Sequence, residues 1–348
     1  MTNNKSYNVA IVGATGAVGQ NIIHYLEEQP FKVNNIKLLS SKRSAGKKLF
    51  FLGNEVVVEE ATENSFNDID IAFFSAGGAI SEKLAPHAVK SGAIVVDNTS
   101  FYRMDEDVPL VVPEVNPEDV KKHNGIISNP NCSTIQMVVA LKPIQEKYGL
   151  KRIVVSTYQA VSGAGLAAND ELRNQTEQYL QSEEMEANIL PAGADKKHYP
   201  IAFNALPQID LFDEGGYTKE ELKMMNETKK IMHDDSLQVA ATCVRLPVFT
   251  SHSESIYIET ETPNISVEQL REILAQGEGI TVEDDPATQT YPTPLSAANK
   301  KDVFVGRIRR DVDVPNGYHM WVVSDNLVKG AAWNTVQIAE TLVKYDIV

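Results

Sequence analysis

The stretch YNVAIVGATGAVGQNIIHYLEEQ, residues 7–29, decides the fold of the first half of this chain. It predicts a short apolar strand at 7–12, a turn with a glycine at every third position, and a helix with one apolar face. Gly13, Gly16 and Gly19 form a variant of the GxGxxG fingerprint, in which glycines let the backbone approach a pyrophosphate at a helix N-terminus. A purely structural turn is the alternative, but the place of the motif between a strand and a helix favours a bound dinucleotide.

Further apolar runs continue the strand pattern of the N-terminal half. They are IKLLSS (36–41), EVVVEEA (55–61), DIAFFSA (70–76), GAIVVDNTS (92–100) and PLVVPEV (109–115). A helical stretch, SEKLAPHAVKSG, lies between two of them. Nearly continuous apolar strands separated by helices predict a Rossmann-like, doubly wound parallel sheet that is covered on both faces.

The pattern changes after about residue 131. Longer strands with clearer alternation follow, among them RIVVSTYQAV, QVAATCVRLPV, ESIYIETE, FVGRIRRD and GYHMWVVSD. Such alternation predicts a mixed or antiparallel sheet. A chain of 348 residues also exceeds the size of most single cores. We therefore predict an α/β protein whose Rossmann-like domain covers 1–131, completed by a C-terminal helix at 328–348, and whose α+β domain covers 132–327.

The composition argues against several classes of protein. The formal charge of −15 disfavours a nucleic-acid partner, which requires clustered Lys and Arg. The apolar runs fall short of the ~20 residues of a membrane span, and the first residues lack a secretory signal. Two cysteines are too few for a disulfide framework and have no metal-ligand spacing. We predict a cytoplasmic protein that acts on a small molecule, holds no metal and binds neither nucleic acid nor membrane.

The segment after the second strand bears on the type of cofactor. NAD-binding folds usually place Asp or Glu there to hold the ribose 2′-hydroxyl, whereas this chain has SSKRSAGK. Ser40, Ser41 and Arg43 are able to hydrogen-bond a 2′-phosphate, and the guanidinium fork of Arg does so with two bonds. A solvated basic loop is the alternative. We predict NADP rather than NAD.

The stretch SNPNCST places Cys132 at the start of an apolar helix. There the backbone N–H groups and the helix dipole favour the thiolate, which is the nucleophilic form of cysteine. The alternative is a small buried hydrophobe, the usual fate of a cysteine. The polar neighbours favour the nucleophile for Cys132, whereas Cys243 in VAATCVRLPV fits the buried role.

A thiolate nucleophile needs a proton partner, and histidine is the usual one. His252 is the best candidate of the seven histidines, because it follows a strand in RLPVFTSHSES, lies in a Ser/Thr-rich turn and has Arg245 seven residues upstream. The sequence pattern alone leaves the choice between this role and that of an ordinary histidine open.

Seven motifs, in one order, resemble the aspartate-β-semialdehyde dehydrogenase family: GATGAVG, SSKRSAGK, DNTSFYRM, SNPNCST, STYQAVSGAG, NETKK and RLPVFTSHSES. They extend from residue 11 to residue 255, and GAAWNTVQIAE resembles the closing helix of the family. The compact length and acidic connections resemble the Gram-positive-type branch. The resemblance implies NADPH-dependent reductive dephosphorylation of β-aspartyl phosphate to aspartate semialdehyde and phosphate, in the biosynthesis of lysine, diaminopimelate, methionine and threonine.

The same resemblance implies three catalytic residues. Cys132 would form a thioester with the substrate acyl group, His252 would move the proton, and Gln159 in STYQAV would orient the intermediate. These roles are carried over from the family motifs.

For the substrate, the resemblance implies Arg245 at the α-carboxylate, Glu227 at the α-ammonium group, and Arg103 and Lys230 at the phosphate. Each of the four, taken singly, is more typical of a surface charge. Glu227 and Lys230 at i, i+3 would share one helix face.

For the cofactor, the resemblance implies four groups of residues. They are Thr15, Gly16, Ala17 and Val18 at the pyrophosphate; Ser40, Ser41, Arg43 and Ser44 at the adenosine side; Ser75, Ala76 and Gly77 along the cleft; and Ser162, Gly163 and Asn326 near the nicotinamide.

Other functions and assemblies stay open at this point. An N-acetyl-γ-glutamyl-phosphate reductase would share the architecture and the Cys/His pair, but Glu227, placed for a free ammonium group, has no role with an acetylated substrate. A glyceraldehyde-phosphate-type dehydrogenase matches SNPNCST only in part, and a non-catalytic Rossmann binding protein is a further alternative. The resemblance implies a homodimer through the second domain, and the sequence does not distinguish it from a homotetramer.

Overall fold

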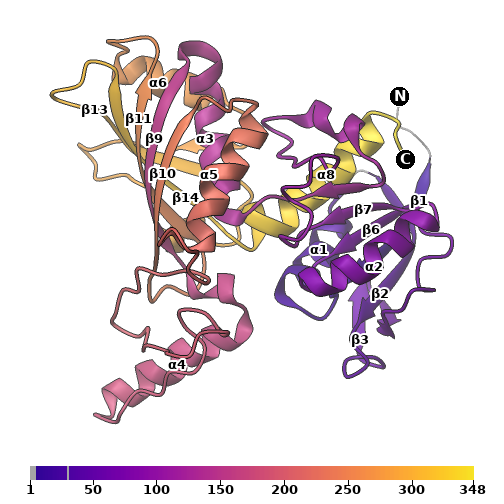
Figure 1. Ribbon diagram of the computed structural model, residues 1–348. Helices are drawn as coiled ribbons and strands as arrows, with labels where there is room; N and C mark the ends of the chain where they lie inside the picture. The colour runs from indigo at the N-terminus through magenta and orange to yellow at the C-terminus, as the bar shows by residue number, and fades with distance from the viewer. Residues whose placement is uncertain (1–4, 30) are drawn as a thin grey trace. The chain divides into compact units, whose positions relative to one another are not determined.

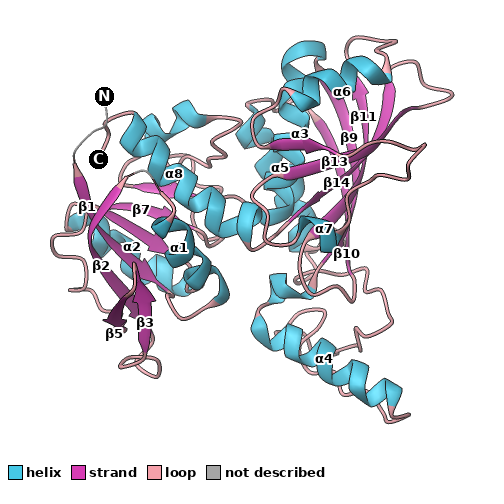
Figure 2. Cartoon of the chain, turned by 180° about the vertical axis from the view of Figure 1, so that it is seen from behind, coloured by secondary structure: helices cyan, strands magenta, loops and turns pink. Residues whose placement is uncertain are grey.

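The computed structural model describes residues 5–29 and 31–348, which form two compact units (Figures 1 and 2). The first unit is Met1–Asn131 with Ala331–Val348, and the second is Cys132–Gly330. Across the described residues, no helix is long and apolar enough to cross a membrane. The predicted α/β class, with one parallel and one mixed sheet, is confirmed.

The first unit contains a six-stranded sheet in the order β5-β2-β1-β6-β7-β8, and all neighbouring strands are parallel. The strands are β1 Ser6–Val12, β2 Lys32–Ser40, β5 Glu59–Glu60, β6 Ile71–Phe74, β7 Ile94–Asp97 and β8 Ile126–Ser128. A separate antiparallel hairpin joins β3 Lys48–Phe51 to β4 Asn54–Val57. The helices are α1 Ala17–Glu27, α2 Gly78–Lys90, the 3₁₀ turn η1 Pro117–Lys122 and α8 Trp333–Lys344.

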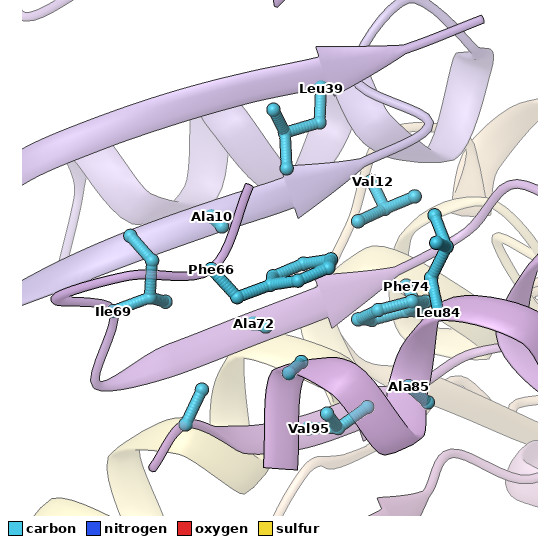
Figure 3. Close-up of a cluster of buried hydrophobic side chains, with 12 residues drawn as sticks. Ala10, Val12, Leu39, Phe66, Ile69, Ala72, Phe74, Leu84, Ala85 and Val95 are labelled. Carbon is cyan, nitrogen blue, oxygen red and sulfur yellow. The ribbon is translucent and has the colours of Figure 1, made fainter. Parts of the chain in front are cut away.

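Both faces of this parallel sheet are buried, as the continuous apolar strands predict. Figure 3 shows one face, where the alternate residues Ala10 and Val12 of β1 and Phe74 of β6 pack with Leu84 and Ala85 of α2. Helix α8 packs against α1 and contacts β7. The sheet therefore holds the ends of β1, β2 and β6 in fixed register around the glycine turn.

One predicted strand in the first unit is absent. The run PLVVPEV, at 109–115, forms only an isolated bridge from Leu110 to Ser128 instead of a strand of its own. Its two prolines, Pro109 and Pro113, lack the N–H donors that a ladder requires. The outer position of the sheet is taken by β8 instead.

The second unit contains a mixed six-stranded sheet in the order β10-β9-β11-β14-β13-β12. Its strands are β9 Leu150–Gln159, β10 Gln238–Arg245, β11 His252–Thr260, β12 Ile280–Val282, β13 Val303–Arg310 and β14 Gly317–Ser324. Its helical segments are α3 Cys132–Tyr148, η2 Val161–Ala164, α4 Leu166–Leu180, α5 Lys219–Met232, α6 Val267–Ala275, α7 Pro294–Ala297 and the start of the π-helical turn Val328–Ala332.

Helices α3 and α5 lie side by side on one face of this sheet (Figure 1). The opposite face carries half-exposed side chains in alternation with the buried ones. They are Val154, Ser156 and Tyr158 on β9, Val244 on β10, Ser255 and Tyr257 on β11, and His319 and Trp321 on β14. The sequence predicts a cofactor-binding domain at 1–131 with 328–348 and a catalytic domain at 132–327. The functions of these two domains stay a prediction.

Candidate functional site

The glycine turn of the first unit is sterically required. Gly13 has a φ of +94°, and a Cβ added there would lie 2.9 Å from the Ser75 carbonyl carbon. A Cβ added at Gly19 would lie 2.2 Å from the Gly13 carbonyl oxygen, because helix α1 starts directly against the turn. The two glycines therefore allow a close approach of backbone to backbone that any side chain would prevent.

The turn leads into a helix N-terminus that is open to an anion. Gly16 is the N-cap residue of α1 and makes no side-chain capping bond. The N–H groups of Ala17 and Val18, in the first turn, have no acceptor within the helix. These groups and the helix dipole fit a pyrophosphate.

A cavity of about 520 Å³ adjoins this turn. Its lining includes six of the residues predicted for the cofactor, which are Thr15, Gly16, Ser40, Ser41, Ser75 and Ala76. The side chains of Thr15 and Ser40 are joined by a hydrogen bond of 2.9 Å. The residues present therefore fit a dinucleotide, with hydroxyl groups on the side where β2 ends.

Two charged residues of this cavity were not predicted. Lys42 lines it directly, and so does Glu60, which β5 places beside Ser40 in the parallel register. Arg43 follows Lys42 in the exposed turn after β2, and Ser44 is buried in the same turn. The segment SSKRSAGK brings basic residues to this turn, but the sequence does not reveal that a neighbouring strand adds a carboxylate.

Two other predicted residues of the first unit lie elsewhere. Gly77 is the N-cap of α2 with a φ of +96°. Arg103 is buried, and its Nη2 donates to the Asn98 carbonyl oxygen at 3.1 Å. Arg103 also lowers the pKa of Asp97, although burial, the largest influence, raises that pKa above its usual value. The structure therefore gives Arg103 a fixed, buried position in the first unit.

In the second unit, strand register gathers three predicted residues at one end of the mixed sheet. Gln159 ends β9 and pairs directly with Arg245, which ends the parallel strand β10. His252 begins the antiparallel strand β11, so that it starts where the other two strands finish. Residues far apart in the chain thus meet at one sheet end.

The backbone of Ala160 holds two of these side chains. Its N–H donates to Nδ1 of His252 at 3.0 Å, and its carbonyl oxygen accepts from Nη1 of Arg245 at 2.6 Å. A neutral imidazole carries one proton, so an accepting Nδ1 places that proton on Nε2. The fully buried Nε2 has no hydrogen-bond partner among the described residues, and it is available as a donor to a bound molecule.

Burial keeps His252 uncharged. Desolvation, followed by the charge of Arg245, lowers the pKa of His252 to about 3, while Glu220 opposes this change. Burial also lowers the pKa of Arg245, whereas Glu220 and Cys132 raise it. Arg245 therefore stays a cation with anionic groups around it, and His252 is a neutral donor near pH 7.

The predicted nucleophile occupies the expected position. Cys132 is the first residue of α3, where the helix dipole favours a thiolate. Gly330 packs so closely against it that an added Cβ would lie 2.7 Å from the Cys132 Cβ. Cys243 is buried, and burial raises the pKa of its thiol, as its predicted structural role requires.

Helix α5 carries the pattern Glu-x-x-Lys twice, as EELK and as ETKK. Nε2 of Gln159 donates to Oε1 of Glu220 at 3.2 Å, and Nζ of Lys223 lies 3.3 Å from Oε2 of Glu220. The second copy, Glu227 and Lys230, lies seven residues further on, or about 10.5 Å along the helix.

Contacts between α3 and α5 show which copy is level with the cysteine. Oγ1 of Thr134 lies 3.7 Å from Sδ of Met224, and Nε2 of Gln145 donates to the Met232 carbonyl at 3.4 Å. The two helices therefore run in the same direction, and the start of α3 lies beside the first turn of α5.

The first turn of α5 contains Glu220 and Lys223. Glu220 bonds to Gln159, and Lys223 lies against Glu220. The substrate roles of Glu227 and Lys230 stay predictions from the family resemblance. The signal that would have found Glu220 and Lys223, a second Glu-x-x-Lys, was present in the sequence.

The predicted nicotinamide-side residues of the second unit also lie together. Nδ2 of Asn326 donates to Oγ of Ser162 at 3.0 Å, and the Ser251 N–H donates to Oδ1 of Asn326 at 2.9 Å. A Cβ added at Gly163 would lie 3.0 Å from Nη1 of Arg245 and 3.5 Å from Nε2 of His252. Gly163 therefore packs directly against the buried side chains of Arg245 and His252, where an added side chain would crowd them.

Known proteins are similar to this chain over nearly its full length. Residues 8–123 match the family model for the semialdehyde dehydrogenase NAD binding domain, and residues 141–329 match that for the dimerisation domain. The aspartate-semialdehyde dehydrogenase of Bacillus subtilis is 60% identical over 344 residues, covering 99% of each chain. That of Aquifex aeolicus is 57% identical over 345 residues, covering 98% of this chain and 99% of the relative.

Solved structures are similar too. Aspartate semialdehyde dehydrogenase II from Vibrio cholerae has a TM-score of 0.92 and 48% identity, covers 98% of this chain and 99% of its own, and has also been solved complexed with ASA. A Candida albicans aspartate semialdehyde dehydrogenase with NADP has a TM-score of 0.74 and 28% identity, covering 99% of this chain and 100% of its own.

Proposed function

Because the chain belongs to the semialdehyde dehydrogenase family, we propose that it is an NADP-dependent aspartate-semialdehyde dehydrogenase. It reduces β-aspartyl phosphate to L-aspartate 4-semialdehyde and phosphate, and it serves the biosynthesis of lysine, diaminopimelate, methionine and threonine. One observation carries the proposal: Arg245 and Glu220, of opposite charge, are held at the sheet end where His252 begins β11. A substrate with both an α-carboxylate and an α-ammonium group needs such a pair.

The substrate contacts follow from these charges. The guanidinium of Arg245 binds the α-carboxylate, and Glu220, fixed by Gln159, binds the α-ammonium group. Lys223 lies in the same turn of α5 and binds the phosphate. The phosphate role of Arg103 stays a prediction from the family resemblance. An acetylated substrate has no ammonium group for Glu220, so the pair disfavours an N-acetyl-γ-glutamyl-phosphate reductase.

The covalent step uses Cys132. Its thiolate attacks the acyl carbon, the S–C bond forms, the C–O bond to phosphate breaks, and the electron pair leaves with phosphate, which takes up a proton. The product of this step is a thioester on the protein. Phosphate release therefore needs no proton transfer to the carbonyl oxygen.

His252 acts on that carbonyl oxygen as a hydrogen-bond donor. Its Nδ1 accepts from the Ala160 N–H, so its Nε2–H is directed to the developing oxyanion, which it stabilises without itself becoming charged. When the thioester has been reduced, the oxyanion collapses to the aldehyde and returns the thiolate. The proton movement expected from the family resemblance stays a prediction for His252, and the tautomer favours the donor role.

The cofactor is proposed to lie in the cavity of the first unit. The N–H groups of Ala17 and Val18 would hold the pyrophosphate, and the hydroxyl groups of Ser40 and Ser41 would hold the 2′-phosphate together with the cation of Arg43 from the adjoining turn. Ser162, Gly163 and Asn326 are proposed for the nicotinamide side. When bound, NADPH supplies the hydride that reduces the thioester.

The assembly is proposed to be a homodimer. The matched dimerisation domain and the half-exposed face of the mixed sheet, with Tyr158, Tyr257 and Trp321 on adjacent strands, support burial against a second copy. A homotetramer and a cytoplasmic location stay predictions from the sequence.

The test follows NADPH formation from aspartate semialdehyde, phosphate and NADP. The parent protein is expected to turn over only with phosphate present, and Cys132→Ala is expected to abolish turnover. Glu220→Gln removes the charge that binds the ammonium group, so the KM for aspartate semialdehyde should rise about 10- to 100-fold. Glu227→Gln, on the same helix, is the matched control and should have a small effect.

Two outcomes would contradict the proposal. A folded parent protein that turns over N-acetylated glutamate semialdehyde instead would exclude the named substrate. A larger KM change in Glu227→Gln than in Glu220→Gln would restore the ETKK copy to the substrate site.

A further inference from the structure

The side chains of Gln159, Arg245 and His252, at one end of the mixed sheet, form a first row. A second row of side chains lies directly behind them. In the mixed sheet, residues directly opposite one another share a face. His252 pairs with Ser324 in the first row, and two residues further along β11 Glu254 pairs with Thr157 of β9. Thr157 in turn pairs with Cys243 of β10. The second row therefore lies about 7 Å behind the first, under the helices α3 and α5.

Glu254 is the unusual member of this row. It is 0% exposed, and neither carboxyl oxygen has a hydrogen-bond partner in the described part of the chain. Gln136 of α3 is equally buried, and its amide oxygen and nitrogen are also without a hydrogen bond there. The two side chains are nonetheless neighbours, because Gln136 lowers the pKa of Glu254 as a side-chain hydrogen-bond donor, although no bond of ordinary hydrogen-bond geometry joins them. Four buried polar atoms of two neighbouring side chains thus lack a hydrogen bond of ordinary geometry.

The helix and the strand are matched in spacing. Gln136 lies four residues after Cys132, on the same face of α3. Glu254 lies two residues after His252, on the same face of β11. One helical turn and two strand residues are similar lengths, about 5 to 7 Å. Gln136 and Glu254 therefore face each other about 5 to 7 Å further along α3 and β11 than Cys132 and His252 do.

The carboxyl group is held in its neutral form. Burial, the largest influence, raises the pKa of Glu254; Gln136 lowers it and Glu220 raises it, and the result is far above the usual value. The titratable groups around it are Glu220 on α5, Cys243 on β10 and His252 on its own strand. A protonated carboxyl offers one donor and one acceptor, which complement the amide of Gln136.

We propose that Glu254 is a positioning residue for the reaction, an uncharged carboxylic acid that joins β11 to the helix of Cys132 through the side chain of Gln136. The connection fixes the separation of the Cys132 sulfur from Nε2 of His252. The expected effect on turnover rests on the function proposed above. The protonation state of the carboxyl group does not.

The first experiment compares infrared spectra of the full-length parent and Glu254→Gln at pH 7. The difference spectrum is expected to contain the carbonyl band of a protonated carboxyl group, which the substitution removes. Bands of an ionised carboxylate in its place would overturn the proposal. This measurement does not depend on any substrate, so it separates failure of this proposal from failure of the proposed function.

The second experiment measures turnover and alkylation of Cys132 by iodoacetamide against pH. Glu254→Gln keeps a neutral polar group of the same size and should retain kcat and the alkylation profile within about threefold, whereas Glu254→Ala should lower kcat about 100-fold through misplacement of the nucleophile. Glu259→Gln, half-exposed at the far end of the same strand, is the control and should resemble the parent.

The contrast between the variants decides the matter. Equal losses in Glu254→Gln and Glu254→Ala, or parent-like behaviour in both, would overturn the positioning role. If Glu254→Ala does not fold, Gln136→Leu replaces it, and an unchanged kcat in that variant would also overturn the role.

Discussion

Replacement of Gly330 by Ala is the most direct test of the geometry around the nucleophile. The added Cβ would lie 2.7 Å from the Cβ of Cys132 and 3.1 Å from its Cα. Carbon atoms in contact prefer about 3.5 to 4.0 Å, so the two residues must separate by about 1 Å. Both of the closest atoms belong to the Cys132 Cα–Cβ bond, which has no rotamer that avoids the clash. Either the start of α3 or the turn at Gly330 therefore moves.

The expected loss is catalytic rather than structural. A misplacement of about 1 Å in a reacting group costs about 100-fold in rate, or about 2.7 kcal/mol of activation free energy. Overpacking costs about 1 to 3 kcal/mol of stability, and the helical preference of Ala over Gly offsets up to about 1 kcal/mol of it. The variant should therefore fold, with a modest fall in melting temperature.

The assay is the phosphate-dependent formation of NADPH, together with the rate at which iodoacetamide labels Cys132. We expect kcat to fall about 100-fold, with a smaller change in the KM for NADP. Gly193→Ala is the matched control, because an added Cβ there meets no atom within 4 Å and the residue is not left-handed. A Gly330→Ala variant with kcat within about threefold of the parent would refute the packing argument.

Two further predictions address charge. Burial lowers the pKa of His252 to about 3 from its ordinary value of 6.5, so between these values the folded protein binds fewer protons than the unfolded one. The free energy of unfolding therefore falls as the pH falls, by about 2.3 kcal/mol from pH 6.5 to pH 4.5. The free energy of unfolding of His252→Gln, measured in urea at the two pH values, should not show this decrease. An identical change with pH in parent and variant would contradict the assignment. Arg43→Ala should raise the KM for NADPH about 10-fold and leave that for NADH unchanged, because only NADPH carries the 2′-phosphate; equal changes in both KM values would contradict it.

Much of the fold was predictable because its signals are local. The strand, glycine turn and helix of residues 7–29 follow from short-range sterics, as the clash distances at Gly13 and Gly19 confirm. The placement of Cys132 at a helix start is local as well. The run PLVVPEV misled because its apolar residues satisfy a strand pattern while Pro109 and Pro113 remove the donors.

The substrate site was only partly predictable, for a reason of periodicity. EELK and ETKK are seven residues apart, which is close to two helical turns, so both copies of Glu-x-x-Lys present the same face. Nothing in the helix itself distinguishes Glu220 from Glu227. The choice depends on the alignment of α5 with α3, where Thr134 lies against Met224. That alignment depends on tertiary packing, which cannot be predicted from the pattern of a single sequence.

The backbone of Ala160 and the second row of side chains explain why the substrate site needs only a few charged residues. Ala160 holds Arg245 and His252 through its own N–H and carbonyl groups, which no side-chain motif can reveal. Behind them, burial raises the pKa of both Cys243 and Glu254, so the second row stays neutral. Charges above a neutral, buried layer are weakly screened and act more strongly on the substrate. A chain of net charge −15 thereby keeps a cation effective where an anionic substrate binds.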